Sequence, residues 1–439
     1  MNITGAPRSF HVPSLTDEGP IRPVQYTTAL LCALLMFLDG FDTQAISYAA
    51  PLITKEWNLS QEVLGPIFSS ALIGLMVGYL AFSPLSDRLG HRRLIIASAL
   101  GFAITTLLAA LTTGTTELLI VRFLTGLGLG SAIPSAVALT SEYAPKRYRA
   151  TFVLAIYCGF SLGFVAAGAA SASLLPHYGW RSLFWLGALA PLLLCVLLYL
   201  WLPESLDFLV CRGSDRQRIV DTLARIGPGQ LRSCTFTTGT LTKGSPIKSL
   251  FMSGRAIGTV LLWVVFFLNL ATFYGLQSWL PSMLTGLKYP LGIVVLATSL
   301  STVGGIVVAV VIGPAMDRIG PCRSLATLYL LGVVFLPLMG VALSRGEWML
   351  LVATFFAGVC VSGGQKSVIA LATLFYPPTI RSTGVGWALG IGRLGGIGGP
   401  LLFGLLFNLH FTPSEVLYAT AIPMLISGCV IAGISKSPR

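Results

Sequence analysis

The chain has 439 residues, of which 54% are hydrophobic and only 10% are charged, and its formal net charge is +12. In a soluble domain about a quarter of the residues are charged, so this composition excludes a soluble globular protein and indicates a polytopic membrane protein. The first 25 residues are polar and contain prolines, unlike a cleavable signal peptide, so we expect the first apolar segment to remain as a transmembrane helix.

Apolar stretches that are long enough to cross a bilayer, which takes about 20 residues in a helix, recur along the whole chain. They predict an all-α membrane protein with twelve transmembrane helices. The expected spans lie near residues 26–52, 63–85, 93–112, 117–141, 150–174, 180–202, 256–281, 290–316, 323–343, 348–374, 382–407 and 413–434.

The basic residues indicate the orientation of these spans. If both termini are cytoplasmic, the outer loops hold only Lys55, Arg181, Lys288 and Arg345, whereas the inner loops and tails hold most of the other Lys and Arg residues. This asymmetry follows the positive-inside rule and predicts a multi-pass protein of the inner membrane with cytoplasmic termini. The positive net charge is therefore explained by topology, without a nucleic-acid partner.

The first span contains two aspartates in the sequence LDGFDTQAIS, residues 38–47. Each costs about 2.5–3.5 kcal/mol at the centre of a membrane helix, so the chain keeps them against a cost of roughly 5–7 kcal/mol. Asp39 and Asp42 project about 60° apart and share one face of the helix. Two carboxylates in a low dielectric resist double ionisation, which suits a proton-coupling site. The structural alternative is that one acid caps a helix break at Gly40 and the other bonds a neighbouring helix.

Two loops of the first half are repeated in the second half. The sequence SPLSDRLGHRR (83–93) returns as GPAMDRIGPCR (313–323), and EYAPKRYRAT (142–151) returns loosely as FYPPTIRSTG (375–384). These repeats predict an internal duplication, which transporter folds often show. In such loops glycine supplies the turn, and the charged residues form latches that break when bundles move. The gating residues expected here are Asp87, Arg88, Gly90, Arg92, Glu142, Asp317, Arg318 and Gly320.

The longest polar stretch lies between the sixth and seventh spans and divides the chain into two halves. Its DRQRIVDTLARI segment, residues 215–226, has the apolar spacing of a surface helix. We expect a cytoplasmic tail at 1–25, a six-helix bundle at 26–202, a cytoplasmic loop at 203–254, a second six-helix bundle at 255–434 and a tail at 435–439.

Three further cations are expected inside the membrane. Arg122 in the fourth span is a candidate partner of the two aspartates or a gating charge, and its alternative role is structural. Arg393 in the eleventh span can offer two parallel donors to a substrate carboxylate, or it can bridge two helices. Lys366 in the tenth span either binds substrate or snorkels to the cytoplasmic surface, and Gln365 beside it can donate to a hydroxyl or a carboxylate.

Aromatic side chains in the spans suit a flat ring by stacking, although most aromatics in membrane helices face lipid. Tyr157 is the one most expected to line a cavity, because IYCGFSLG places it beside glycines of the fifth span. The aromatic candidates are Phe41, Tyr157, Phe160, Phe267, Phe273, Tyr274, Trp279 and Trp387.

The loop sequence between the second and third spans resembles the signature of the major facilitator superfamily, although Ser83 and His91 depart from its pattern. Within that superfamily, LDGFDTQAISYAAP, YCGFSLG, WLPES, SWLPSML, GGQ and STGVGWALGIGRLGG resemble segments of the aromatic acid:proton symporters. The resemblance covers the whole chain. It implies twelve helices in two bundles, a role of Asp39 and Asp42 in proton-coupled uptake, and an uncharged residue in the place of Lys366.

Together these features predict a proton-coupled importer of an aromatic monocarboxylate, such as benzoate, a hydroxybenzoate or a related phenolic acid, that works as a monomer by alternating access. The alternatives are a proton symporter of another small organic acid and an exporter of drugs or metabolites. The sequence offers no nucleophile triad or phosphate loop, so we expect no enzyme and no cofactor besides the coupling proton. The eight cysteines include no C-x-x-C pair and are expected to be reduced, without a metal site.

Overall fold

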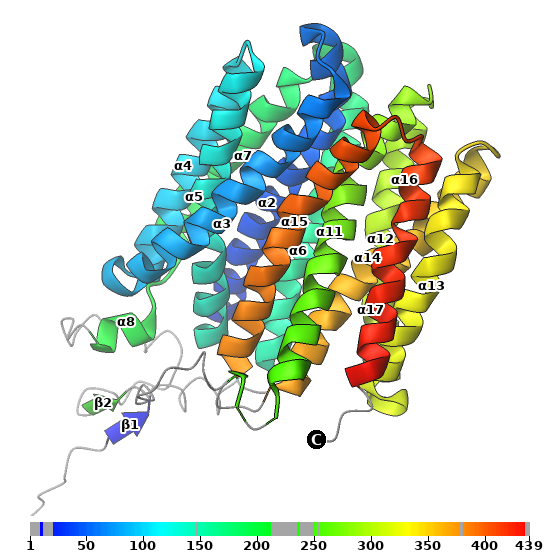
Figure 1. Cartoon of the computed structure of the whole chain (residues 1–439). Helices are drawn as coiled ribbons and strands as arrows, with labels where there is room; N and C mark the ends of the chain where they lie inside the picture. Colours follow the sequence, from blue (N-terminus) through cyan, green and yellow to red (C-terminus); the bar gives the residue numbers. More distant parts are fainter. Residues whose placement is uncertain are drawn as a thin grey trace, which may run out of the picture.

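The computed structural model describes residues 9–11, 21–145, 148–211, 235–237, 250–252, 254–376 and 381–434. The described part is helical except for one pair of short strands, β1 (Ser9–His11) and β2 (Thr235–Thr237). The long helices run side by side as one bundle, and α8 and the strand pair lie beside one end of it (Figure 1). The long helices are α2 (Pro23–Trp57), α3 (Leu64–Leu89), α4 (His91–Leu111), α5 (Thr115–Tyr143), α6 (Arg149–Tyr178), α7 (Arg181–Trp201), α11 (Ala256–Gly286), α12 (Leu291–Ile319), α13 (Pro321–Ala342), α14 (Glu347–Phe375) and α15 (Arg381–Asn408), followed by α16 (Pro413–Ala419) and α17 (Ala421–Ile434).

The twelve predicted spans correspond to these helices in chain order. Eleven segments are long and apolar enough to cross a bilayer, and α3 adds the shorter apolar stretch Leu64–Tyr79. The last span differs from the expected single helix because α16 ends at Ala419 and α17 begins at Ala421. Pro423 has no N–H with which to bond the carbonyl of Ala419, so the helix is interrupted there. The all-α fold of a multi-pass membrane protein is confirmed.

The two halves pack in the same way. In the first half α2 packs on α6 and α3 packs on α5, and in the second half α11 packs on α15 and α12 packs on α14. The repeated loops also share their backbone conformation, because Gly90 has φ 92° and ψ 148° and Gly320 has φ 99° and ψ 145°. A positive φ of this kind favours glycine, so both turn glycines of the repeat are explained by the backbone.

The halves meet through α3 with α15, α6 with α12, and α2 with α11. Ser69 of α3 donates to the carbonyl of Ile397 of α15 at 2.9 Å, and Gln44 of α2 donates to the carbonyl of Gln277 of α11 at 3.4 Å. These bonds lie between the middle of the bundle and the end where α3 begins, opposite the end where α2 begins. Among the described residues, the halves are therefore bonded to each other in the part of the bundle away from the chain termini, with one further bond near the middle of the helices, from Arg393 of α15 to Tyr79 of α3.

Helix α2 runs without interruption through Gly40 and the two aspartates. A Cβ at Gly40 would collide with the carbonyl oxygen of Phe160 on α6, and Gly159 and Gly163 of α6 approach the backbone of α2 equally closely. Small residues permit such close contact between helices in a membrane. Gly40 is therefore a packing residue, and the helix break considered as a structural alternative is absent from α2.

The strand pair and the short helix α8 (Leu206–Cys211) were not expected from the sequence. Strands β1 and β2 are parallel, with Phe10 opposite Phe236, so three residues of the N-terminal tail pair with three residues of the segment between the halves. Two-stranded sheets depend on their surroundings for stability, and single short strands give a weak sequence signal. The surface helix predicted at 215–226 lies outside the described residues.

Candidate functional site

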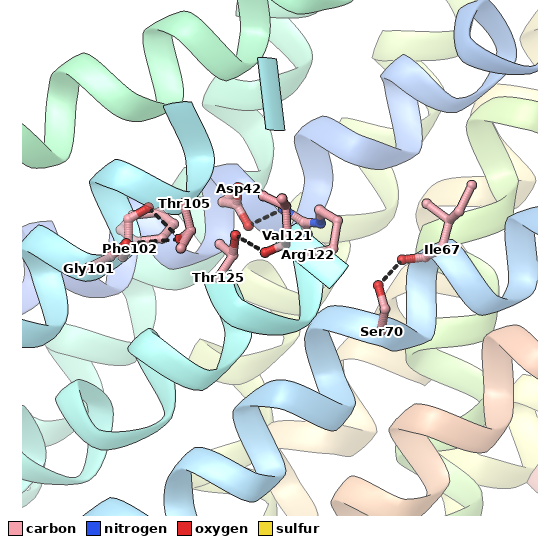
Figure 2. Close-up of polar contacts among 9 residues, drawn as sticks. All are labelled: Asp42, Ile67, Ser70, Gly101, Phe102, Thr105, Val121, Arg122 and Thr125. Atoms are coloured by element: carbon pink, nitrogen blue, oxygen red, sulfur yellow. Dashed lines mark hydrogen bonds and ion pairs between the residues drawn. The ribbon is translucent and has the colours of Figure 1, made fainter. Parts of the chain in front are cut away.

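The first element of the site is an ion pair between α2 and α5. The Nη1 atom of Arg122 lies 2.6 Å from Oδ2 of Asp42, and the side chains are 2% and 3% exposed. Figure 2 shows the Arg122 side chain reaching from α5 to Asp42, with the Thr125 hydroxyl bonded to the Val121 carbonyl one turn away. The structure thus places Arg122 against one of the two acids, as considered from the sequence. A charge pair this deeply buried holds α2 and α5 together.

Asp39 has a different environment, although it is as buried as Asp42, with 3% of its surface exposed. Within the described part of the chain its carboxylate forms neither a hydrogen bond nor a salt bridge. The charges that act on it are those of Arg393 from α15, Asp42 from its own helix and Arg122 from α5. Asp39 is therefore the acid that can bind and release a proton without breaking an ion pair.

Arg393 is held by tyrosines from both halves. Its Nη1 atom donates to the hydroxyl of Tyr274 on α11 at 2.8 Å, and its Nη2 atom donates to the hydroxyl of Tyr79 on α3 at 3.1 Å. The guanidinium also lies 5.4 Å from the centre of the Tyr79 ring and 5.9 Å from that of Tyr274. The salt bridges among the described residues do not include Arg393, so its charge has no carboxylate partner there.

Tyr157 of α6 lies close enough to Arg393 and Tyr274 to interact with both electrostatically. Tyr79 belongs to the same group but was missed by the sequence analysis. The available signal was a phenol hydroxyl far from either end of an apolar helix, where it needs a polar partner. The structure therefore gathers three tyrosines and Asp39 around one arginine, from four different helices.

Aromatic rings continue this group toward the end of the bundle where α3 begins. Phe164 of α6 and Phe273 of α11 face each other across the two halves with ring centres 6.2 Å apart, and Phe273 lies edge-on to Tyr274 at 5.1 Å. Phe160 packs on Phe164 with ring centres 4.9 Å apart.

The other aromatic candidates lie elsewhere. Phe267 and Trp387 are 38% and 41% exposed on the bundle surface. Trp279 packs on Phe68 across the halves, and Phe41 is buried.

Gln365 and Lys366 of α14 are both partly buried. Neither forms a hydrogen bond or an ion pair among the described residues. The ionisable group next to Lys366 is the exposed thiol of Cys158 on α6, which belongs to the other half. Lys366 therefore lies within electrostatic range of α6, which belongs to the other half.

The loop charges of the first half form a separate cluster at the end where α2 begins. Glu204 accepts from the backbone N–H of Arg92 at 3.0 Å, and it contacts Gly90 so closely that a Cβ there would meet its carboxylate. Glu142 accepts from the hydroxyl of Ser205 at 2.9 Å and from the backbone N–H of Leu206 at 3.1 Å. Gly90, Arg92 and Glu142 thus belong to one cluster that ties α4, α5 and the end of α7 together.

The other predicted gating residues are Asp87, Arg88, Asp317, Arg318 and Gly320. The side chains of Asp87, Arg88 and Asp317 lie outside the described part of the structure. Arg318 is exposed at the end of α12, and Gly320 supplies the turn that follows it. The latch role expected for both repeated loops therefore stays a prediction.

The central group is suited to binding an anion and a proton near each other. Arg393 supplies a positive charge, its tyrosine partners supply hydroxyls, and Asp39 supplies a carboxylate within the field of the same arginine. A charge-assisted hydrogen bond to an arginine is roughly twice as strong as a neutral one. Any anion that binds here competes with Asp39 for the charge of Arg393.

Comparison with known proteins places the chain among membrane transporters. A family model described as Major Facilitator Superfamily matches residues 32–305 and 262–438. The 4-hydroxybenzoate transporter of Pseudomonas aeruginosa is 38% identical over 424 residues, which cover 96% of this chain and 94% of that protein. The gallate transporter of Pseudomonas putida is 36% identical over 424 residues, or 94% of each chain. Among solved structures, the inward-open xylose transporter of E. coli matches with a TM-score of 0.76 at 18% identity, over 94% of this chain and 97% of that one.

Proposed function

Because the chain belongs to the major facilitator superfamily, we propose that it is a proton-coupled symporter that imports an aromatic monocarboxylate, such as benzoate, a hydroxybenzoate or a related phenolic acid, by alternating access. It is a multi-pass membrane transporter and not an enzyme. The observation that carries the proposal is Arg393, a cation deep in the bundle that is bonded to two tyrosine hydroxyls and has no carboxylate partner among the described residues.

The substrate carboxylate supplies the missing anion. Each tyrosine hydroxyl accepts a hydrogen bond from Arg393, which leaves its own O–H free to donate to the same carboxylate. Tyr79 comes from the first half and Tyr274 from the second half, so one bound carboxylate contacts both halves at once. Binding therefore stabilises arrangements in which the halves are close together at this depth.

The aromatic part of the substrate is assigned to the rings beside Tyr274. Phe164 and Phe273 flank the boundary between the halves, next to Arg393's tyrosine partner. Ring pairs of this kind contribute about 0.5–1.5 kcal/mol beyond their buried area. The two relatives named above carry 4-hydroxybenzoate and gallate in their names, and both compounds are aromatic acids.

Proton coupling is assigned to Asp39, with Asp42 in a supporting role. The groups that face Asp39 are Arg393 from α15, Arg122 from α5, Asp42 from α2, Tyr79 from α3 and Tyr274 from α11. When Asp39 is ionised it competes with the substrate for Arg393, and when it is protonated Arg393 is free to bind the carboxylate. Proton and substrate then enter the site together. The Asp42–Arg122 pair keeps α2 in place during this exchange.

The two halves, residues 26–202 and 255–434, are proposed as the moving bodies, with the segments at 1–25, 203–254 and 435–439 on the cytoplasmic side. Positive residues favour this orientation in the inner membrane. With it, the bonds of Ser69 and Gln44 close the outer end of the bundle, which corresponds to an inward-facing arrangement. The protein is proposed to work as a monomer. Gln365 lies on the same helix as Lys366 and is proposed as an additional substrate contact.

The proposal is tested by equilibrium binding of 4-hydroxybenzoate to the purified protein. Arg393→Lys keeps the charge but loses the two-pronged donor geometry, which costs about 1.5–3 kcal/mol or roughly ten- to a hundredfold in affinity. Lys55→Gln removes an exposed cation at the far end of α2 and serves as the control. An unchanged affinity in Arg393→Lys would contradict the carboxylate assignment.

The substrate class is tested by uptake. A panel of labelled aromatic, aliphatic and nicotinate-type acids, measured with and without a protonophore, separates an aromatic acid symporter from the other organic acid symporters considered above. Uptake of aromatic acids that collapses with the protonophore is the expected result. If the protonophore abolishes efflux of the labelled acids and not their uptake, the protein is an exporter.

A further inference from the structure

Gln277 of α11 is a buried amide whose two ends differ in their hydrogen bonding. It is 2% exposed, and its Nε2 atom donates to the hydroxyl of Thr302 on α12 at 2.9 Å. That hydroxyl donates in turn to the carbonyl of Thr298 at 3.4 Å, so it serves as the acceptor for the amide and fixes which end of the amide it meets. The Oε1 atom of Gln277 is buried and accepts no hydrogen bond within the part of the chain that the structure describes. A buried acceptor is costly to leave unpaired.

The position of Gln277 on α11 places it beside the aromatic pair of the candidate site. Phe273 faces Phe164 of α6 with ring centres 6.2 Å apart. Gln277 follows Phe273 by one turn and shares its face of the helix, about 6 Å further along. The amide therefore borders the ring pair on the side toward the end of α11.

The contact between α6 and α12 leads to the same position. A Cβ at Gly168 of α6 would lie 3.0 Å from the hydroxyl oxygen of Ser299 on α12. Helix α6 is the fifth span and α12 is the eighth, so the two run in opposite directions. Phe164 lies one turn before Gly168. Thr302 lies one turn after Ser299, so Phe164 and Thr302 come to the same level. Because Gln277 is bonded to Thr302, its amide lies at the level of the ring pair.

The cation of the site lies at the opposite end of the ring pair. A Cβ at Gly399 of α15 would meet the carbonyl of Ala271 on α11. One turn nearer the start of α15, a Cβ at Gly396 would meet the ring of Tyr274. Helices α11 and α15 are the seventh and eleventh spans and run in the same direction, so the Tyr274 ring extends toward the start of α11, where its hydroxyl accepts from Arg393. The amide lies one turn beyond Tyr274 in the other direction.

We propose that Oε1 of Gln277 accepts a hydrogen bond from a hydroxyl in the para position of the substrate ring while Arg393 holds the carboxylate. A buried acceptor that only a donor in the ligand can satisfy rejects ligands that lack this donor. Gln277 is then the residue that selects 4-hydroxylated benzoates over benzoate itself. Thr302 is a positioning residue, because it occupies Nε2 and leaves Oε1 for the ligand. The inference rests on the proposed function, because it takes Arg393 as the carboxylate site and the Phe164–Phe273 pair as the ring site.

The first test varies the ligand and needs no protein variant. Equilibrium binding to the purified protein is measured for benzoate, 4-fluorobenzoate, 4-hydroxybenzoate and 2-hydroxybenzoate. Fluorine is similar in size to a hydroxyl but has no hydrogen to donate, so 4-hydroxybenzoate should bind about tenfold or more tightly than 4-fluorobenzoate. The hydroxyl of 2-hydroxybenzoate lies beside the carboxylate and should give no such gain over benzoate. Equal affinities for the two para-substituted acids, or equal gains from the two hydroxyl positions, would overturn the inference.

The second test uses Gln277→Leu, which removes the acceptor with little change in size. This variant should bind 4-hydroxybenzoate and 4-fluorobenzoate with affinities within about threefold of each other. Asn269 is the matched control, because it is a buried amide of the same helix whose Nδ2 atom donates to the carbonyl of Val361 on α14 at 3.3 Å and whose Oδ1 atom also accepts no hydrogen bond among the described residues. Asn269→Leu should keep the preference for the hydroxyl. A preference that survives in Gln277→Leu, or that Asn269→Leu removes equally, would contradict the assignment.

The two proposals fail in different ways. If Arg393→Lys weakens the binding of benzoate but the para hydroxyl gives no gain, the proposed function stands and only the role of Gln277 is lost. If no aromatic acid binds to the parent protein, both fail. If Gln277→Leu does not fold, the comparison of 4-hydroxybenzoate with 4-fluorobenzoate on the parent protein still decides the inference.

Discussion

The Asp42–Arg122 pair predicts a stability pattern that distinguishes the two aspartates of α2. Arg122→Gln leaves the Asp42 carboxylate buried without its counter-ion, and Asp42→Asn leaves the arginine charge in the same position. Breaking a buried pair from one side costs about 3–5 kcal/mol, whereas replacing both partners by neutral groups is often nearly neutral. With both side chains at most 3% exposed, solvent screening does not reduce this cost.

The chain provides a matched control in the pair between Glu56 and Arg181. Its N–O distance is 2.7 Å, almost the same as in the buried pair, but its side chains are 44% and 37% exposed. Exposed pairs contribute about 0–1 kcal/mol, so Arg181→Gln should have a small effect. The exposed pair has more neighbours than the buried one, because Arg181 also donates to the carbonyl of Thr112 and Trp180 donates to Glu56, so a smaller effect of Arg181→Gln would arise from burial and not from fewer contacts.

The assay is a double-mutant cycle on purified protein in detergent, with the free energy of unfolding measured by denaturant titration. Each single variant, Asp42→Asn and Arg122→Gln, should lose about 3–5 kcal/mol, and the double variant should recover most of this loss. Additive losses in the double variant, or losses no larger than in Arg181→Gln, would refute the structural role of the pair.

Three further predictions follow from the same contacts. Asp39→Asn should be as stable as the parent protein but should lose gradient-driven accumulation of substrate. Uptake by the parent protein should rise as the outside pH falls. Full accumulation by Asp39→Asn in a proton-gradient assay would exclude Asp39 as the coupling acid. In intact cells, cysteines introduced at 203–254 should not react with an impermeant thiol reagent, whereas cysteines that replace Lys55 or Lys288 should react. The reverse labelling pattern would show that the termini lie on the outer side of the membrane. Gly40→Ala should remove the peak of folded protein in fluorescence-detected size exclusion, because the new Cβ collides with the Phe160 carbonyl. Gly101→Ala, which has open space around its Cβ, should fold normally. Equal behaviour of the two variants would contradict the close packing of α2 on α6.

The spans could be predicted from the sequence because crossing a bilayer requires about 20 apolar residues, which composition alone reveals. The repeated loops were equally accessible, and the shared backbone conformation of Gly90 and Gly320 explains why glycine recurs there. The break between α16 and α17 could not be located so easily. Pro423 was visible, but prolines such as Pro51 and Pro134 lie inside helices that continue.

The candidate site was predictable only in part. Asp39, Asp42, Arg122 and Arg393 stood out because charges are rare in membrane helices. Their partners did not stand out, because Tyr79 and Arg393 are 314 positions apart and meet only when the halves pack. The nearness of Lys366 to α6 was also undetermined, since a sequence gives the depth of a side chain along a helix but does not show which helix lies beside it.

Gly40 lies between the two aspartates, and its requirement has a different origin from theirs. The glycine is needed for the contact of α2 with α6, whereas Asp39 is proposed to carry the coupling proton and Asp42 pairs with Arg122. Neighbouring residues of α2 are therefore required for unrelated physical reasons. A transporter of this fold coupled to another ion would have no need of Asp39, but it would need the glycine as long as α2 packed on α6 in this way. Within LDGFDTQAIS, Gly40 is thus tied to the fold and Asp39 to the proposed coupling ion.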